Sequence, residues 1–276
     1  MRTRKAAVEG RFYPLTKSRI FDQIMAIEKS DKYPEPDLSP REVFGAILPH
    51  AGHIYSGYQT IPFFQLIRRH RLFPDTFVIV HPNHSGFGKA LAIDDSATWS
   101  NAIGEVPLDR EFALAMDLPF DSKAHAREHS AEVIIPFMQY FLGSHPFSIV
   151  PVCMMDQGFK TASRVAESIL NSVEKTGRKI MLIASCDFSH FLPAEEGTAL
   201  DEKVLDCIRG RNAPGVEQAV IKHRISVCGY GPIMVLMEYV RSKTNNYAVE
   251  ILARGHSGEV IPSKEVVDYI SLMTYI

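Results

Sequence analysis

Short apolar runs and longer amphipathic stretches alternate along most of this chain. Continuous apolar runs are typical of strands buried on both faces, and apolar spacings of three and four residues are typical of helices. The expected strands are residues 43–48, 77–80, 91–93, 147–153, 179–185, 247–253 and 266–274. The expected helices are residues 17–30, 57–70, 130–142, 162–174, 200–209, 214–223 and 232–241.

The alternation of strands with helices predicts an α/β fold with a largely parallel sheet. The sequence contains no internal repeat and no linker rich in Gly, Ser or Pro, and we interpret the prolines at positions 34, 36 and 40 as part of a loop. A chain of 276 residues is long enough to bury a large core. We therefore expect a single domain over residues 1–276.

The composition excludes several classes of protein. Hydrophobic residues make up 46% of the chain and charged residues 22%, which excludes a disordered chain. The 30 Lys and Arg residues against 32 Asp and Glu residues give a net charge of −2, so no nucleic-acid partner is expected. The N-terminus leads into no apolar signal segment and no apolar run is long enough to span a membrane, so we expect a reducing, cytoplasmic setting and no membrane partner.

Histidines directly follow three of the expected buried strands. They are His50, His81 with His84, and His190. The carboxyl ends of parallel strands lie along one edge of a sheet, where ligands bind, so these rings are expected to converge. A single loop histidine is more often a surface or capping group. Three at matching positions favour a metal site, because imidazole is a common metal ligand.

The segment around Cys228 is the next candidate. It lies just before an expected helix with Pro232 in its first turn, and a helix N-terminus lowers the pKa of a thiol. The resulting thiolate is a good soft ligand or nucleophile. The alternative is a small buried apolar residue, which is the usual role of cysteine. We expect that role for the other cysteines: Cys153, Cys186 and Cys207.

Three further side chains have two interpretations each. His129 opens an expected helix, where it stays neutral as a base, ligand or donor, or simply belongs to a capping sequence. Asp187 either orients a metal-bound histidine or caps the next turn. Tyr55 either offers its phenol to a substrate or packs in the interior. The remaining histidines considered are expected at the surface: His70, His125, His145, His223 and His256.

Seven blocks of sequence, in order along nearly the whole chain, resemble the Memo family, whose microbial members are protein B of the AmmeMemoRadiSam system. The blocks are residues 9–14 (EGRFYP), 49–57 (PHAGHIYSG), 82–84 (PNH), 128–132 (EHSAE), 149–152 (IVPV), 187–190 (DFSH) and 228–233 (CGYGPI). The resemblance implies a fold similar to the class III extradiol dioxygenases of the LigB type. That fold is an α/β three-layer sandwich with a mixed, largely parallel central sheet.

The resemblance also implies a site. Carried over by motif, the metal ligands are His50, His84 and Cys228, with Fe(II) as the expected cofactor and Cu or Zn as alternatives. His190 is expected as acid/base, and Asp187 and His129 are expected to line the same cleft as further catalytic residues. Tyr55, near His50, is a candidate for the substrate cleft, and His81 is either an extra cleft histidine or merely a neighbour. The chain departs from the family pattern in two places, because His81 replaces a glycine and Ser85 replaces a second histidine.

Three functions remain open at this stage. The first is a metal-dependent oxidoreductase, similar to a dioxygenase, that uses iron or copper. The second is a non-enzymatic peptide-binding, phosphotyrosine-binding or scaffold protein that uses the same cleft. The third is a hydrolase with Cys228 as nucleophile and His190 as base. The expected ligand is a small molecule or a peptide, and the system's name suggests radical SAM and AMMECR-type proteins as partners.

Overall fold

The computed structural model describes residues 2–30 and 32–276, and its largest element is a mixed sheet of eight strands. Its central strands pair in parallel in the order β2 (Val43–Leu48), β8 (Ile180–Ser185), β3 (Thr76–Pro82) and β7 (Ser148–Met154). Antiparallel strands flank them: β10 (Ala248–His256) and β11 (Val266–Tyr275) beside β2, β4 (Leu91–Ile93) beside β7, and β9 (His190–Leu192) against β11. The expected mixed sheet with a parallel centre is confirmed.

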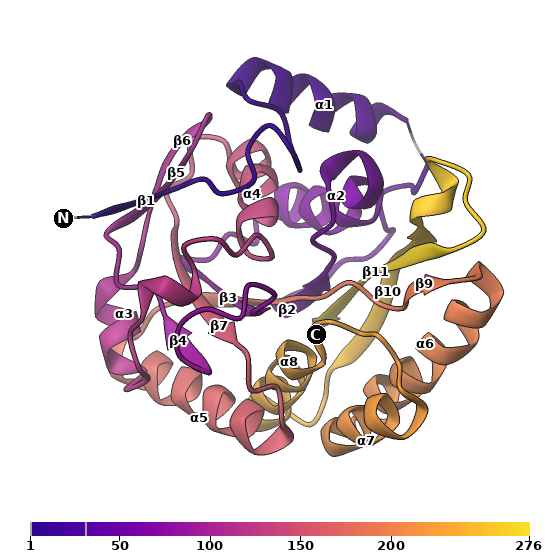
Figure 1. The fold of residues 1–276 in the computed structure, drawn as a ribbon. Helices are drawn as coiled ribbons and strands as arrows, with labels where there is room; N and C mark the ends of the chain where they lie inside the picture. Colours follow the sequence, from indigo (N-terminus) through magenta and orange to yellow (C-terminus); the bar gives the residue numbers. More distant parts are fainter. Residues whose placement is uncertain (1, 31) are drawn as a thin grey trace.

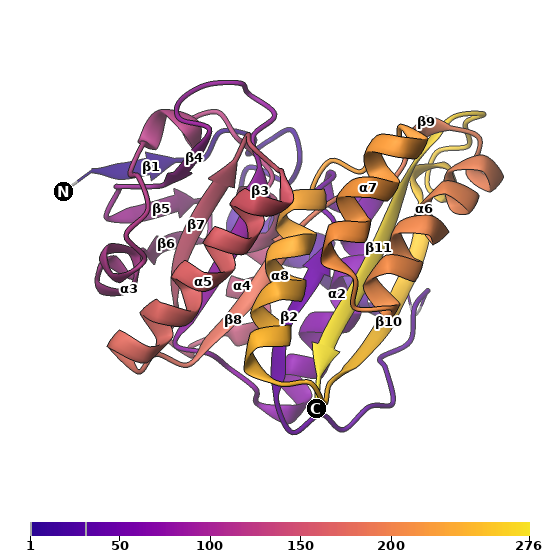
Figure 2. The same ribbon diagram turned by 90° about the horizontal axis from the view of Figure 1, so that it is seen from below.

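Helices cover both faces of this sheet, which gives three layers (Figure 1). One face carries α1 (Lys17–Lys29), α2 (His53–His70) and α4 (Ile135–Leu142). The other carries α5 (Phe159–Thr176), α6 (Ala194–Arg209), α7 (Ala213–His223) and α8 (Tyr230–Lys243), which lie in front of the sheet in Figure 2. Among the described residues, no helix combines the length and the apolarity needed to cross a membrane.

A small second sheet lies at the side of the sandwich. It consists of β1 (Thr3–Lys5), β5 (Thr98–Asn101) and β6 (Gly104–Pro107), and α3 (Arg110–Ala115) follows it. The sequence pattern did not predict these elements because they are short and carry few consecutive apolar residues. Helix α2 begins at His53, four residues before the expected start at position 57. The helix expected over residues 130–142 is a 3₁₀ turn, Glu132–Ile134, followed by α4.

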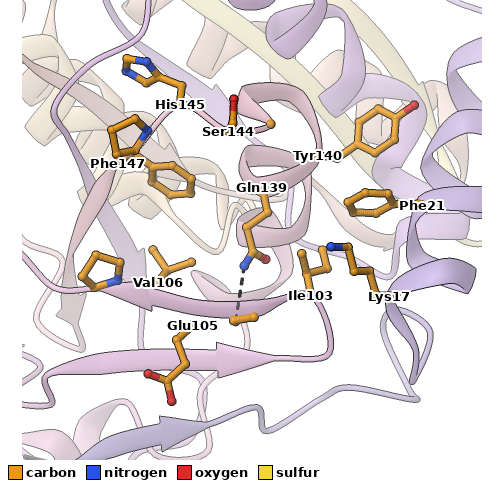
Figure 3. A pocket seen from close by; sticks show the side chains of 14 residues that line it. Lys17, Phe21, Ile103, Glu105, Val106, Gln139, Tyr140, Ser144, His145 and Phe147 are labelled. Atoms are coloured by element: carbon orange, nitrogen blue, oxygen red, sulfur yellow. Dashed lines mark hydrogen bonds between the residues drawn. The ribbon is translucent and has the colours of Figure 1, made fainter.

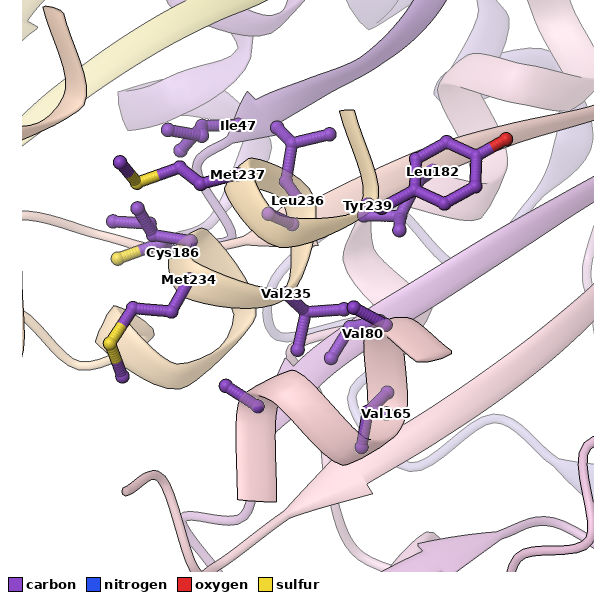
Figure 4. Packing of buried hydrophobic residues seen from close by; sticks show 14 of the residues in the cluster. Ile47, Val80, Val165, Leu182, Cys186, Met234, Val235, Leu236, Met237 and Tyr239 are labelled. Atoms are coloured by element: carbon purple, nitrogen blue, oxygen red, sulfur yellow. The ribbon is translucent and has the colours of Figure 1, made fainter. Parts of the chain in front are cut away.

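The core is divided by the sheet into two large clusters of apolar side chains. Figure 4 shows one of them, where Val235 and Leu236 of α8 pack toward Val80, Leu182 and other strand residues. All four cysteines are free. Cys153 and Cys186 are fully buried and Cys207 is half-buried, so the core and near-core positions expected for these three are confirmed.

A pair of buried carboxyl groups joins α6 to β11. Asp201 and Asp268 are 0% and 3% exposed, and Asp201 Oδ1 accepts hydrogen bonds from the backbone N–H and the hydroxyl of Ser189. Burial raises the pKa of Asp201 to about 8, and the neighbouring Asp268 raises it further against the opposing hydrogen bonds from Ser189. The two groups therefore share a proton at neutral pH, because two carboxylates in contact cannot both ionise.

We expect Asp201→Asn to remove a pH dependence of folding stability. Between the pKa of the unfolded carboxyl, about 4, and the folded value near 8, the folded state binds more protons than the unfolded state. The free energy of unfolding of the wild type therefore falls as pH rises through this window, by roughly 1.4 kcal/mol per pH unit. Denaturant unfolding at about pH 5 and about pH 9 measures it.

The amide of the Asp201→Asn variant does not titrate, so its curve lacks this component. Asp206→Asn is the control, because the Asp206 side chain is 74% exposed on the same helix. Parallel pH profiles for the wild type and the Asp201→Asn variant would contradict the shared proton.

Candidate metal centre

The carboxyl ends of the central strands bring three potential metal ligands together. His50 lies two residues beyond the end of β2, His84 two residues beyond the end of β3, and Cys228 two residues before α8. Their ligand atoms all lie within 4.8 Å of one another, and His50 Nε2 is 3.3 Å from Cys228 Sγ. Three residues that are distant in the sequence thus form one compact set of two nitrogens and one sulfur.

The tautomer of His50 is fixed by a chain of hydrogen bonds. The Ser185 hydroxyl donates to the Ser130 carbonyl at 2.6 Å, so its oxygen is left to accept from His50 Nδ1–H at 2.7 Å. With a proton held on Nδ1, Nε2 is the ring atom that faces Cys228. The backbone N–H of His50 donates to Asp187 Oδ1 at 2.7 Å, which fixes the loop itself.

Glu128 holds the second side of the site. Its side chain is 1% exposed, and its carboxylate accepts from the backbone N–H groups of His84, Ser85, His129 and Ser130. It also accepts from the Nδ1 atoms of His84 at 3.0 Å and His129 at 3.2 Å. Burial alone raises the pKa of Glu128, but the hydrogen bonds from His129 and His84 hold it well below its ordinary value. The carboxylate therefore stays charged and orients the His84 ring through Nδ1. Burial lowers the pKa of His84, but its hydrogen bonds with Cys228 and Glu128 raise it to about 10.

Cys228 is placed by a close approach of its loop to β8. A Cβ atom on Gly229 would lie 2.4 Å from the Ser185 carbonyl oxygen, so a larger residue does not fit there. The backbone N–H of Asp187 donates to Cys228 Sγ at 3.3 Å. Burial raises the pKa of the Cys228 thiol, yet its hydrogen bond with Cys186 and the adjacent His50 lower it well below the ordinary value. The sulfur is therefore poised to act as a thiolate ligand.

Of the residues expected around the site, His129 lies directly beside this set. The ring of His129 lies beside both ligand histidines, with ring centroids 5.4 Å from His50 and 4.9 Å from His84. His190 is half-buried, and its Nδ1 lies 2.8 Å from the Ser226 carbonyl. Burial raises the pKa of Asp187. The positive charges of His50 and, to a smaller extent, His190 oppose that rise. Tyr55 lies partly exposed in the first turn of α2.

Two histidines differ from the expectations. The prediction that His125 is a surface residue is wrong, because its ring is 0% exposed. His81 was expected in the cleft, but it belongs to β3, is also 0% exposed, and its ring contacts His125 with centroids 5.2 Å apart. The physical reason is that β3 continues two residues beyond the apolar run, so His81 is a strand residue packed in the interior.

The donor set fits a transition metal. Two imidazoles whose Nδ1 atoms are held by Ser185 and Glu128, together with one low-pKa thiol, suit Fe(II), Cu or Zn, because a bound ion replaces any proton on the Nε2 atoms. Three ligands leave further coordination positions. The His84 side chain is 36% exposed, so the set borders solvent on the His84 side. A separate surface cavity of about 540 Å³, lined by Phe21, Tyr140 and Phe147, is drawn in Figure 3. Phe147 directly precedes β7, so this cavity lies at the opposite, amino-terminal edge of the sheet.

Comparison with known proteins identifies the family. The sequence model described as "Memo-like protein" matches residues 4–273. The chain belongs to the Memo family. A MEMO1 family protein of Archaeoglobus fulgidus is 38% identical, with 98% of each chain covered, and one of Methanococcoides burtonii is 32% identical, with 98% of this chain and 99% of the relative covered.

A solved structure supports the fold. An uncharacterized protein of Escherichia coli K12 superposes with a TM-score of 0.51 and 14% sequence identity, covering 76% of this chain and 90% of that one. At this identity the likeness concerns the fold alone.

Sequence reasoning missed two residues that orient the ligands. The sequence pattern places Glu128 only within the block of residues 128–132, and Ser185 only at the end of an expected strand. A glutamate directly before a histidine is a usable signal for a carboxylate that orients it. For Ser185 the useful signal is a polar residue at the end of an otherwise apolar buried strand.

We expect Glu128→Gln to weaken metal binding. The amide has one acceptor oxygen in place of two and cannot serve the backbone N–H groups and both Nδ1 atoms, so His84 is no longer held in one tautomer. Loss of such a partner lowers metal affinity by about 10–100-fold. Competition with a chelator of known affinity measures the change.

Glu111→Gln serves as the control for Glu128→Gln, because the Glu111 side chain is 67% exposed and pairs with Arg178 away from the site. Equal affinities in the two variants would show that Glu128 does not orient the ligands.

Proposed function

We propose that this Memo-family protein is a metal-dependent oxidoreductase, similar to a dioxygenase, that acts on a small molecule with iron(II) as its metal. The observation that carries the proposal is the convergence of His50, His84 and Cys228 at a solvent-facing edge of the sheet. When bound, such an ion supplies Lewis acidity and one-electron chemistry. Copper is the alternative metal, because a thiolate in place of a carboxylate favours softer ions.

The residues around the metal ligands have separate tasks. Ser185 and Glu128 hold the protons on Nδ1 of His50 and His84, so that both Nε2 atoms face the Cys228 sulfur. The backbone N–H of Asp187 donates to the same sulfur and limits its negative charge. This arrangement is fixed before a substrate arrives, which removes the cost of reorganisation from the reaction.

His190 is the residue we assign to proton transfer. Its Nδ1 lies 2.8 Å from the Ser226 carbonyl, an acceptor, so the proton sits on Nδ1 and Nε2 carries the lone pair. The ring is half-buried, so part of it is open to solvent. A neutral imidazole with a free Nε2 accepts a proton from a substrate hydroxyl.

The arrangement gives less support to a hydrolase that uses His190 as the base for Cys228. A cysteine nucleophile needs its base within hydrogen-bond reach. The rings within reach of Cys228 Sγ are those of His50, at 3.3 Å, and His84, whereas His190 Nδ1 is directed to the Ser226 carbonyl. The sulfur also lies among the donors of a metal site, which is the position of a ligand.

The test compares protein purified and loaded with Fe(II) under anaerobic conditions. We expect His84→Ala and Cys228→Ser to lose most of the bound iron and, with it, dioxygen uptake in the presence of catechols. His145→Ala is the control, because His145 is exposed and lies in the segment before β7, at the far edge of the sheet. Iron content and an oxygen electrode provide the two readouts.

Two results would overturn the proposal. Failure of the wild type to retain iron at all would remove the metal-dependent function. Retention of iron with equal dioxygen uptake in both ligand variants would remove the roles of His84 and Cys228. A protein that binds peptides with unchanged affinity in both variants would instead be the non-enzymatic binding protein.

A further inference from the structure

A second set of potential metal ligands lies inside the molecule, apart from the site at the sheet edge. It consists of His81 on β3, Cys153 on the neighbouring β7, and His125, which follows the 3₁₀ turn Ser122–Ala124. All three residues are 0% exposed, and their ligand atoms lie within 4.8 Å of one another. The first site does not use any of these three residues.

The two rings are held by their outer nitrogens. His81 Nδ1 lies 3.1 Å from the Pro82 carbonyl oxygen, and His125 Nε2 lies 3.1 Å from the Ala92 carbonyl oxygen. A carbonyl is only an acceptor, so each contact calls for a proton on that outer nitrogen. The inner nitrogens, His81 Nε2 and His125 Nδ1, face each other at 3.3 Å. With the outer protons in place, both inner nitrogens present lone pairs to each other.

A second proton on either ring would let its inner nitrogen donate to the other, but neither ring takes up that proton at neutral pH. Burial lowers the pKa of His125 to about 3, and it lowers the pKa of His81 well below the ordinary value. Burial also raises the pKa of the Cys153 thiol, so the sulfur brings no negative charge of its own. Two facing lone pairs and an adjacent sulfur are the donor pattern that a cation satisfies.

The distances suit a common ion. Two ring nitrogens that are each 2.0–2.1 Å from one metal lie about 3.3–3.6 Å apart at tetrahedral or trigonal angles. The observed separation of the inner nitrogens is 3.3 Å. Hydrogen bonds from the outer nitrogens of metal-bound histidines to backbone carbonyls are the usual second layer of such sites. Pro82 and Ala92 already supply these carbonyls.

We propose that His81, His125 and Cys153 form a second, interior metal site that binds Cu(I). A soft thiolate with two imidazoles in a trigonal arrangement is a donor set for copper. Among the described residues, no fourth His, Cys or carboxylate completes this group, and Cu(I) needs fewer ligands than Zn²⁺. On binding, the Cys153 thiol gives its proton to solvent, and the single charges of thiolate and ion cancel, so no net charge is buried.

The competing arrangement is a metal-free hydrogen-bonded chain. The Ser130 hydroxyl lies 3.0 Å from His81 Nδ1 and can donate to it, after which His81 Nε2–H donates to His125 Nδ1. This chain diverts the Ser130 hydroxyl from Glu128 Oε1 at 2.9 Å and leaves the lone pair of His81 Nδ1 facing the Pro82 carbonyl. The two arrangements differ in the number of copper ions that the folded protein holds.

The experiment is an anaerobic titration of the intact protein with Cu(I) against a chromogenic Cu(I) chelator. Each equivalent that the protein withholds from the chelator is counted for the wild type and for Cys153→Ser, Cys228→Ser and the double variant. Cys207→Ser is the matched control, because Cys207 is a half-buried free cysteine in α6, outside both sets of ligands. Circular dichroism and thermal unfolding verify that each variant is folded. Cys153→Ala is a second variant at the same position, in which an apolar side chain replaces the thiol.

We expect the wild type and Cys207→Ser to withhold about two equivalents, each single ligand variant about one, and the double variant none. If only the interior site exists, the wild type withholds one equivalent and Cys153→Ser none. This result would count against the site of the proposed function and leave the interior site standing. Copper binding that is the same in folded Cys153→Ser, folded Cys153→Ala and the wild type would overturn the interior site. Loss of all copper in Cys228→Ser alone would do so as well.

Discussion

A single buried carboxylate, Glu128, fixes the His84 side of the candidate metal centre. A charge removed from water is costly unless it is fully hydrogen bonded, so the folded chain must bring donors to it. It does so with backbone N–H groups and ring nitrogens from two segments, residues 84–85 and 129–130. The same hydrogen bonds therefore satisfy the carboxylate and orient His84. They also leave the loop after β3 little freedom to adopt another path.

The N-terminal segment contains a second buried charge, that of Arg4, which is also satisfied by hydrogen bonds. The Arg4 guanidinium donates to the Glu128 and His125 carbonyls and pairs with Glu132 at 2.8 Å, while it stacks 4.0 Å from the centre of the Trp99 ring. Glu132 in turn accepts from the Tyr13 hydroxyl at 2.8 Å. The first residues of the chain thus support, from behind, the segment that carries Glu128 and His129.

The sequence was most informative where local patterns determine structure. Apolar runs predicted the buried strands, and the rule that parallel strands end at one edge predicted that His50 and His84 meet. Cys228 is a candidate ligand because it precedes an expected helix and because of the family resemblance. The metal-binding roles of all three residues remain predictions. Glu128 and His125 were not predictable in this way, because polar residues in a loop usually face water. Their burial depends on Arg4, more than 120 positions away along the chain.

The contact between His50 and Cys228 spans 178 positions of sequence. An ion held by both is a reversible cross-link that closes a loop of most of the chain. By the arithmetic of loop closure, a link of this length removes conformational freedom from the unfolded chain worth about 5 kcal/mol, comparable to a long-range disulfide. An ion bound to both residues would therefore slow the global unfolding that exposes the chain to proteases.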